Sequence, residues 1–319
     1  MTDYKRFAEM ATRIRENVEV VIRGKSDVID LAIVCLIAEG HLLIEDVPGL
    51  GKTMLARAIA ASVDAEYRRI QFTPDLLPSD VTGVSIYNQN TREFEFQMGP
   101  IFANVVLADE INRASPKTQS ALLEVMEERR VTVDGEPRNV PRPFMVVATQ
   151  NPIELEGTYR LPEAQLDRFL MRVEMGPPDL ATEIDILRTH GERNPLDTLR
   201  PVVTGQDIAG MAAAANTVHV SEGILEYTAR ISQATRTTPE IRIGVSPRGT
   251  LALIRAARVR AAMDGREFVS PDDIRLLAPA VMNHRLILSP EAELLGRKAA
   301  AVLASVMDAI PVPQRRVNA

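Results

Sequence analysis

The chain has 319 residues but only one cysteine, Cys35, so it can form neither an intrachain disulfide nor a cysteine-based metal cluster. Because Cys35 lies in the apolar stretch LAIVCLIA, we interpret it as a small buried hydrophobic residue. The histidines lie far apart without metal-ligand spacing, and we expect them on the surface or at helix ends: His41, His190, His219 and His284. No Cys–His or Ser–His–Asp arrangement is visible in the sequence, which disfavours covalent catalysis.

The sequence also lacks a long hydrophobic run. The longest one, from Leu31 to Ala38, is far shorter than the roughly 20 residues that span a bilayer. The first residues, MTDYKRFAEM, lack the charged-then-apolar pattern of a signal peptide. With 45% hydrophobic and 25% charged residues, the composition is that of a globular protein. We therefore expect a soluble, cytoplasmic protein of about two domains.

Positive charge is not in excess. Lysine and arginine total 37 residues against 43 aspartates and glutamates, which gives a net charge of −6. Nucleic-acid binding needs a basic face, so DNA or RNA is not the expected main partner.

Short apolar runs alternate with helical patterns in the first 176 residues. The runs lie at 41–46, 67–72, 105–110, 144–149 and 169–175. Several are continuously apolar, as in parallel strands that are buried on both faces. The alternation predicts an α/β fold, a three-layer sandwich around a parallel five-stranded sheet.

A domain boundary is predicted at Gly176, Pro177 and Pro178, because these residues interrupt any regular element. The segment 179–312 carries apolar residues at helical spacing, which predicts a small all-helical domain after the 1–176 core. Three Ser-Pro pairs have the pattern of an N-cap followed by a first helical proline, at Ser246, Ser270 and Ser289. Asp273 would complete a capping box with Ser270.

The segment DVPGLGKT, from Asp46 to Thr53, has the context of a phosphate-binding loop, because it follows a predicted strand and precedes a helical pattern. Its glycines let backbone amides turn toward phosphate oxygens, and the helix N-terminus adds partial positive charge. Lys52 would neutralise the β and γ phosphates, and Thr53 would offer its hydroxyl to Mg²⁺. The strict pattern begins with glycine where this chain has Asp46. The expected nucleotide contacts are Val47, Pro48, Gly49, Leu50, Gly51, Lys52, Thr53 and Met54.

Polar side chains follow two other buried strands. The run VVLADE ends in two carboxylates, and unpaired buried charge is costly, so a function is expected for them. Asp109 could hold Mg²⁺ through water, and Glu110 could orient and polarise the attacking water. After FMVVAT, the amide of Asn151 could contact the γ-phosphate or hold that water. The alternatives are two solvated acids in a loop and a turn asparagine before proline.

These motifs, in this order, resemble the AAA+ ATPases and, within them, the MoxR family. The resemblance covers residues from about 18 to 310 and rests on DVPGLGKT, VVLADEINRAS, VVATQNPIELEGTYRLPEAQLDRF and GVSPRGTLALIRAAR. The run GTYRLPEAQLDRF is the most specific, although the family more often has proline where Arg160 stands. The resemblance implies that Lys52 and Thr53 belong to Walker A, that Asp109 and Glu110 belong to Walker B, and that Asn151 is sensor 1.

The resemblance also implies roles for two arginines. Arg168 matches the arginine finger. It would lie at the subunit edge and reach a nucleotide only across an interface. An arginine placed on the transition-state charge raises the rate by ~10³–10⁵. Arg248 matches sensor 2, and we expect it to face the domain cleft and couple the angle of the helical domain, the lid, to the γ-phosphate. A surface salt bridge is the alternative for both. The segment from Ile22 to Lys25 aligns with the segment that lines the adenine, and Ile22 and Gly24 are the expected contacts.

Two hairpin insertions are predicted, near 73–104 and 129–142. VSIY and FEF flank a polar turn in the first, and Asp134-Gly135 is a strong two-residue turn signal in the second. The family resemblance places both near a central pore, in contact with a substrate or partner. Surface hairpins that pair with a neighbouring subunit are the alternative. Nucleic acid is disfavoured because the second hairpin lacks aromatic stacking residues.

The sequence therefore predicts an ATPase that hydrolyses ATP to ADP and phosphate with Mg²⁺ in an oligomeric ring, expected to be a hexamer. The resemblance implies a chaperone-like role in the remodelling or maturation of protein complexes, with von Willebrand factor A-domain proteins as typical partners of the family. The alternatives are a motor subunit of a metal chelatase and a nucleotide-gated binding module with little turnover.

Overall fold

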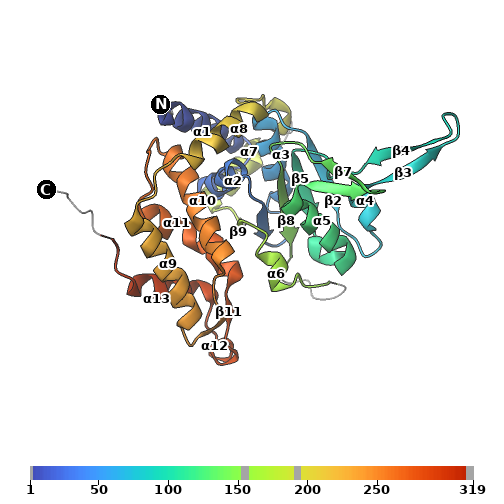
Figure 1. Cartoon of the computed structure of the whole chain (residues 1–319). Helices are drawn as coiled ribbons and strands as arrows, with labels where there is room; N and C mark the ends of the chain where they lie inside the picture. Colours follow the sequence, from blue (N-terminus) through green and yellow to red (C-terminus); the bar gives the residue numbers. More distant parts are fainter. Residues whose placement is uncertain (1–2, 152–157, 190–194, 314–319) are drawn as a thin grey trace.

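The computed structural model describes residues 3–151, 158–189 and 195–313. A five-stranded sheet lies at its centre (Figure 1), with the strand order β2-β5-β8-β1-β9 and every neighbouring pair parallel. Its strands are β1 (Leu42–Glu45), β2 (Tyr67–Gln71), β5 (Val105–Asp109), β8 (Met145–Gln150) and β9 (Met171–Val173). Each of the five predicted apolar runs forms one strand, so the predicted α/β fold is confirmed.

The sheet separates two hydrophobic cores, because successive side chains of a strand point to opposite faces. In β5, Val105 and Leu107 join one core, whereas Val106 and Ala108 join the other. Helices α1 (Tyr4–Glu19), α2 (Ser26–Ile37) and α3 (Lys52–Ser62) pack into the first core. Helix α5 (Pro116–Glu128), preceded by η1 (Ile111–Arg113), packs into the second. The short helices α4 (Pro78–Thr82) and α6 (Glu163–Leu166) complete this part of the chain.

Both predicted hairpins are present. The first pairs β3 (Gly83–Asn88) with β4 (Glu93–Met98) and projects from the body of the molecule in Figure 1. The second pairs β6 (Arg130–Val133) with β7 (Glu136–Asn139). Its turn residues Asp134 and Gly135 have φ values of 54° and 81°, the left-handed pair that a type I′ turn requires. The hairpins meet where the Arg138 guanidinium lies 4.3 Å from the ring centre of Phe96.

The second half of the chain is mainly helical. Its elements are α7 (Leu180–Thr189), η2 (Pro195–Thr198), α8 (Gly205–Asn216), α9 (Glu222–Thr237), β10 (Ile241–Ile243), α10 (Pro247–Met263), α11 (Pro271–Met282), η3 (Asn283–Arg285), β11 (Ile287–Leu288), α12 (Pro290–Leu294) and α13 (Ala299–Ala309). Ser246, Ser270 and Ser289 each cap a helix as predicted, and Ser270 forms a capping box with Asp273. The strands β10 and β11 add a short antiparallel pair to the helices.

The helical part and the sheet-containing part share one core. Phe7, Ala11 and Ile14 of α1 belong to the same buried cluster as Leu253 and Ala257 of α10. The boundary at 176–178 therefore lies in the chain path and does not separate two hydrophobic cores. None of the helices described here is both long and apolar enough to cross a membrane.

The expectation of surface or capping histidines is wrong for two of them. His41 is 5% exposed: its Nε2 lies 3.0 Å from the Met126 carbonyl oxygen, and its Nδ1 accepts a hydrogen bond from the Val146 amide. His284 is also buried, with Nε2 3.1 Å from the Phe169 carbonyl oxygen. A neutral imidazole can donate from one ring nitrogen and accept at the other, and His41 does both with the backbone. His219 is exposed as expected, His190 lies outside the described residues, and Cys35 is buried as predicted.

Candidate functional site

The segment 46–53 joins the carboxyl end of β1 to the start of α3. Gly49 and Gly51 have φ values of 87° and 86°, in the left-handed region that glycine adopts without cost. Gly51 is the N-cap of α3, and no side chain caps this helix. The first amides of α3 therefore keep the arrangement that binds an anion at a helix N-terminus.

Lys52 lies among the acids of the adjacent segments. Its Nζ donates a hydrogen bond of 2.6 Å to the Asp46 carbonyl oxygen. Burial lowers the pKa of Lys52, while the carboxylates of Asp109, Asp46 and Glu110 act in the opposite direction. The loop and the acidic pair, which are far apart in the sequence, are thus brought to one edge of the sheet.

Asp46, the residue that departs from the strict pattern, has defined partners. Its Oδ1 accepts a hydrogen bond from the Val47 amide, and its Oδ2 accepts one of 2.6 Å from the Gly176 amide. A glycine could not form either bond. Asp46 therefore fixes the start of the loop against the segment that follows β9, a contact that sequence reasoning did not foresee.

Asp109 and Glu110 share Thr149 as a partner. The buried Thr149 hydroxyl donates to Asp109 Oδ1 at 2.6 Å and accepts from the Glu110 amide at 2.9 Å. Glu110 has a φ of 57°, a strained conformation for a residue with a side chain and one that clusters at active sites.

Two residues of the neighbouring strand β2 also contact the acids. Arg69 Nη2 lies 2.6 Å from Asp109 Oδ2, and Gln71 Nε2 donates to Glu110 Oε2 at 2.9 Å. Arg113 Nη1 adds an ion pair of 3.2 Å with the same Glu110 oxygen. Sequence reasoning missed Arg69, Gln71 and Thr149. Gln71 and Thr149 lie at the carboxyl ends of β2 and β8, and Arg69 lies in the middle of β2. Their closeness to the acids follows from the order of the strands in the sheet.

Asn151 directly follows β8, beside the strands that carry the loop and the acids. The adjacent Gln150 ties this point to the loop, because its side chain donates to Glu45 and its carbonyl oxygen accepts from the Asp46 amide. The following part of the quoted motif, residues 152–157, lies outside the described residues. Asn151 is therefore at the same sheet edge as Lys52, Asp109 and Glu110.

The segment expected to line the adenine lies against the loop. A Cβ atom added to Gly51 would be 3.8 Å from Ile22 Cδ1 and 3.8 Å from Met175 Cε. Gly24 has a φ of 68° and lies against the side chain of Thr182 in α7. These contacts put residues 22–24 next to the phosphate loop, where an adenine contact remains a prediction.

Arg168 and Arg248 lie at the opposite edge of the sheet. Both pair with Glu127 near the end of α5: Arg168 Nε is 3.1 Å from Oε2, and Arg248 Nη1 is 3.2 Å from Oε1. The neighbouring Met126 carbonyl contacts His41, which directly precedes β1. Strands of four to six residues separate this edge from the phosphate loop, roughly 13–20 Å at 3.3 Å per residue.

In this structure, Arg248 therefore forms the ion pair named as its alternative, with Glu127 at the amino edge of the sheet, and its role as sensor 2 stays a prediction. Asp167 holds the start of α10 at the amino edge of the sheet, because it accepts from Ser246 Oγ at 3.2 Å and pairs with Arg285 Nε at 2.6 Å. A pocket of about 270 Å³ at this edge is lined by Asp167, Arg168, Leu170, Arg248, Leu251, Ala252, Arg255 and Arg285.

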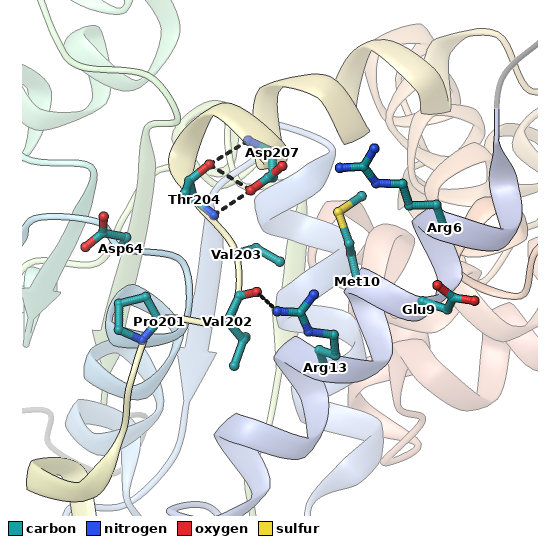
Figure 2. A pocket seen from close by; sticks show the side chains of 10 residues that line it. All are labelled: Arg6, Glu9, Met10, Arg13, Asp64, Pro201, Val202, Val203, Thr204 and Asp207. Carbon is teal, nitrogen blue, oxygen red and sulfur yellow. Dashed lines mark hydrogen bonds between the residues drawn. The ribbon is translucent and has the colours of Figure 1, made fainter.

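A larger cavity of about 500 Å³ lies elsewhere, between α1 and the segment 201–207. Figure 2 shows Arg6, Met10 and Arg13 of α1 facing this segment, with Arg13 donating to the Val202 carbonyl oxygen. Three acids line the cavity, Glu9, Asp64 and Asp207, and Asp207 is engaged in the capping box of α8. None of the predicted site residues lines this cavity.

Comparisons with known proteins agree with this geometry. Residues 41–171 match the model of the ATPase family associated with various cellular activities (AAA), and residues 233–306 match an AAA lid domain. The chain is 52% identical to the uncharacterized protein YeaC of Bacillus subtilis over 94% of each chain. It is 40% identical to Chaperone MoxR1 of Mycobacterium tuberculosis over 98% of this chain and 85% of that one.

A solved structure, that of a candidate ATPase from Cytophaga hutchinsonii, superposes with a TM-score of 0.92 at 36% identity. The superposition covers 98% of this chain and 97% of that one. The matched AAA core and lid, together with relatives that extend over nearly the whole chain, establish the family. The chain belongs to the MoxR family of AAA+ ATPases.

Proposed function

We propose that this chain hydrolyses ATP to ADP and phosphate in an oligomeric ring, expected to be a hexamer. The observation that supports it best is the separation of the site into two halves. The loop, Lys52, Asp109, Glu110 and Asn151 lie at the carboxyl edge of the sheet. Arg168 and Arg248 lie at the amino edge of the same sheet, too far away to act on the same nucleotide. In this proposal, two neighbouring chains form one complete site.

In this proposal, the loop amides and Lys52 bind the phosphates, with Ile22 and Gly24 beside the adenine. Glu110 polarises the attacking water, and Asn151 orients it against the γ-phosphate. Arg168 and Arg248 of the next subunit stabilise the charge of the transition state. The strained Glu110 backbone and its bond to Thr149 hold the carboxylate in a fixed place.

The residues present fit Mg²⁺. The Thr53 hydroxyl and the Asp109 carboxylate are oxygen donors of the kind that this ion prefers. The ion would neutralise phosphate charge when bound. In this structure, the ion pair with Arg69 holds the Asp109 carboxylate at the carboxyl edge of the sheet.

We also propose a chaperone-like role in the remodelling or maturation of protein complexes, for which the name of the MoxR1 relative gives support. The expected client is a protein, with a von Willebrand factor A-domain protein as the first candidate partner. The two hairpins are candidate contacts for it because Phe94 and Tyr87 are exposed on the first one. A cytoplasmic location is part of this proposal.

The first experiment measures ATP hydrolysis against protein concentration for the wild type and Arg168→Ala. The proposal expects a specific activity that rises with concentration and falls ~10³-fold or more in the variant. Arg130→Ala is the control, because Arg130 pairs only with the exposed Glu128 among the described contacts. A flat profile with an active Arg168→Ala variant would remove the shared site from the proposal.

A further inference from the structure

One carboxylate connects the two arginines at the amino edge of the sheet. Glu127 lies in the last turn of α5, and each of its oxygens contacts a different arginine, at 3.1 Å for Arg168 and 3.2 Å for Arg248. Arg168 comes from the segment between α6 and β9, whereas Arg248 is the second residue of α10 in the helical part. Glu127 thus joins residues that are 80 positions apart through a single side chain.

The position of Glu127 is not explained by the stability of its own helix. The C-terminus of a helix carries partial negative charge, so a carboxylate in the last turn is unfavourable there. The ion pairs with Arg168 and Arg248 offset this unfavourable interaction with the helix C-terminus. The pocket of about 270 Å³ that Arg168 and Arg248 line is also lined by Arg255, Arg285 and the acid Asp167. Without the Glu127 carboxylate, the guanidinium groups of Arg168 and Arg248 would repel each other.

Among the contacts of the described residues, Arg168 pairs with Glu127 through its Nε, and Arg248 pairs with it through one terminal amino group. A guanidinium carries five N–H donors, so each can hold Glu127 on one side and an anion on the other. Arg285 needs no such anion, because Asp167 and backbone carbonyls already bind it.

We propose that Glu127 is a positioning residue that holds Arg168 and Arg248 side by side as one unit for the polyphosphate of a neighbouring subunit. The proposal rests on the proposed function and adds the group that sets the spacing of the two arginines. A preassembled pair does not have to be ordered when the anion arrives, and misplacement of a catalytic group by about 1 Å costs on the order of 10²-fold in rate.

The test compares Glu127→Gln with Glu128→Gln. Both acids lie at the end of α5, but Glu128 pairs only with Arg130 among the described contacts. Glu127→Gln is expected to lower kcat about 10- to 100-fold, with the Kd for ATP and the thermal unfolding temperature unchanged. Glu128→Gln is expected to match the wild type. A Glu127→Gln variant with wild-type kcat, or one that changes kcat only through a lowered unfolding temperature, would overturn the proposal.

Mixed rings give a second readout that a structural role would not move. A Glu127→Gln subunit has an intact phosphate loop and acidic pair, whereas a Glu110→Gln subunit has an intact pair of Arg168 and Arg248. A mixture of the two is expected to hydrolyse ATP faster than the average of the separate proteins, because some interfaces combine the intact half of each. A rate at or below that average would contradict action on the neighbour.

The proposed function can fail separately. Wild-type protein without hydrolysis at any concentration would overturn the ATPase proposal, whereas an active wild type, an inactive Arg168→Ala and an unchanged Glu127→Gln would overturn only the role of Glu127.

Discussion

At the scale of single residues, Thr149 organises the acidic pair. It is 1% exposed, and its one hydroxyl serves both Asp109 and the backbone of Glu110. Threonine is the residue that can donate and accept from one atom while keeping the branched shape that suits a strand. The acids therefore depend on a neighbour that belongs to a different strand.

We expect Thr149→Val to lower kcat and to lower the free energy of unfolding by about 1–3 kcal/mol, because an amide and a carboxylate lose their partner. Urea denaturation and steady-state hydrolysis measure the two effects. Thr228→Val is the control, since the Thr228 hydroxyl is buried and, among the described residues, bonds only to a carbonyl of its own helix. It should leave kcat unchanged; a Thr149→Val enzyme with wild-type kcat would contradict the assignment.

At the scale of elements, His41 joins three of them at the amino edge of the sheet. It precedes β1, contacts the end of α5 through Met126, and accepts from Val146 of β8. The ring of Phe144 packs edge-on against it at 5.6 Å. Burial lowers the pKa of His41 to about 3, with the cations Arg129, Arg255 and Arg248 acting in the same direction. The neutral imidazole thus contacts the C-terminal end of α5, the helix that carries Glu127 in its last turn.

The stability of the fold should therefore fall in acid. The unfolded chain binds a proton at His41 near pH 6.5, whereas the folded chain does so only near pH 3. Stability from this group is complete above about pH 7.5 and is lost as the pH falls, by about 2 kcal/mol at pH 5. Urea denaturation across this range should show that the free energy of unfolding changes less steeply with pH for His41→Gln than for the wild type. Equal slopes would show that His41 titrates alike in the folded and unfolded chain.

At the scale of the whole molecule, the sheet separates the two sets of predicted site residues. The carboxyl edge carries Lys52 and the acids, and the amino edge carries Arg168 and Arg248, which pair with Glu127. The proposed ring follows from this arrangement, since each chain would complete the site of one neighbour.

ATP should therefore promote assembly when hydrolysis is blocked. We expect Glu110→Gln to bind ATP with near wild-type affinity, to hydrolyse it at least about 10²-fold more slowly, and to accumulate as a ring in sedimentation velocity. Glu110→Gln combined with Arg168→Ala should bind ATP but remain smaller. Wild-type hydrolysis by Glu110→Gln would show that Glu110 is not the residue that activates water.

Sequence patterns predicted the strands, the capping serines and the Asp134-Gly135 turn, because each depends on a few neighbouring residues. They did not predict the partners of the acids, since the adjacency of β2, β5 and β8 is a property of the sheet order. The burial of His41 was missed because it depends on the end of α5, 85 positions away.

The partner of Arg248 in its ion pair, Glu127, was not predicted for a related reason. This pairing is set by the contacts of Asp167 with Ser246 and Arg285, and nothing in the local sequence of the SPRG segment encodes them. The family resemblance supplied the identity of both arginines as expectations, but the structure was needed to see that they lie together.

The shared core of α1 and α10 has a mechanical consequence. Two domains that bury one continuous hydrophobic cluster resist bending against each other, because a hinge between them would expose apolar side chains to water. We therefore expect the chain to move as one rigid body. In the proposed assembly, motion would then occur at the interfaces between subunits, where the arginines of one chain meet the nucleotide of the next. Hydrolysis of the γ-phosphate would first rotate neighbouring subunits against each other.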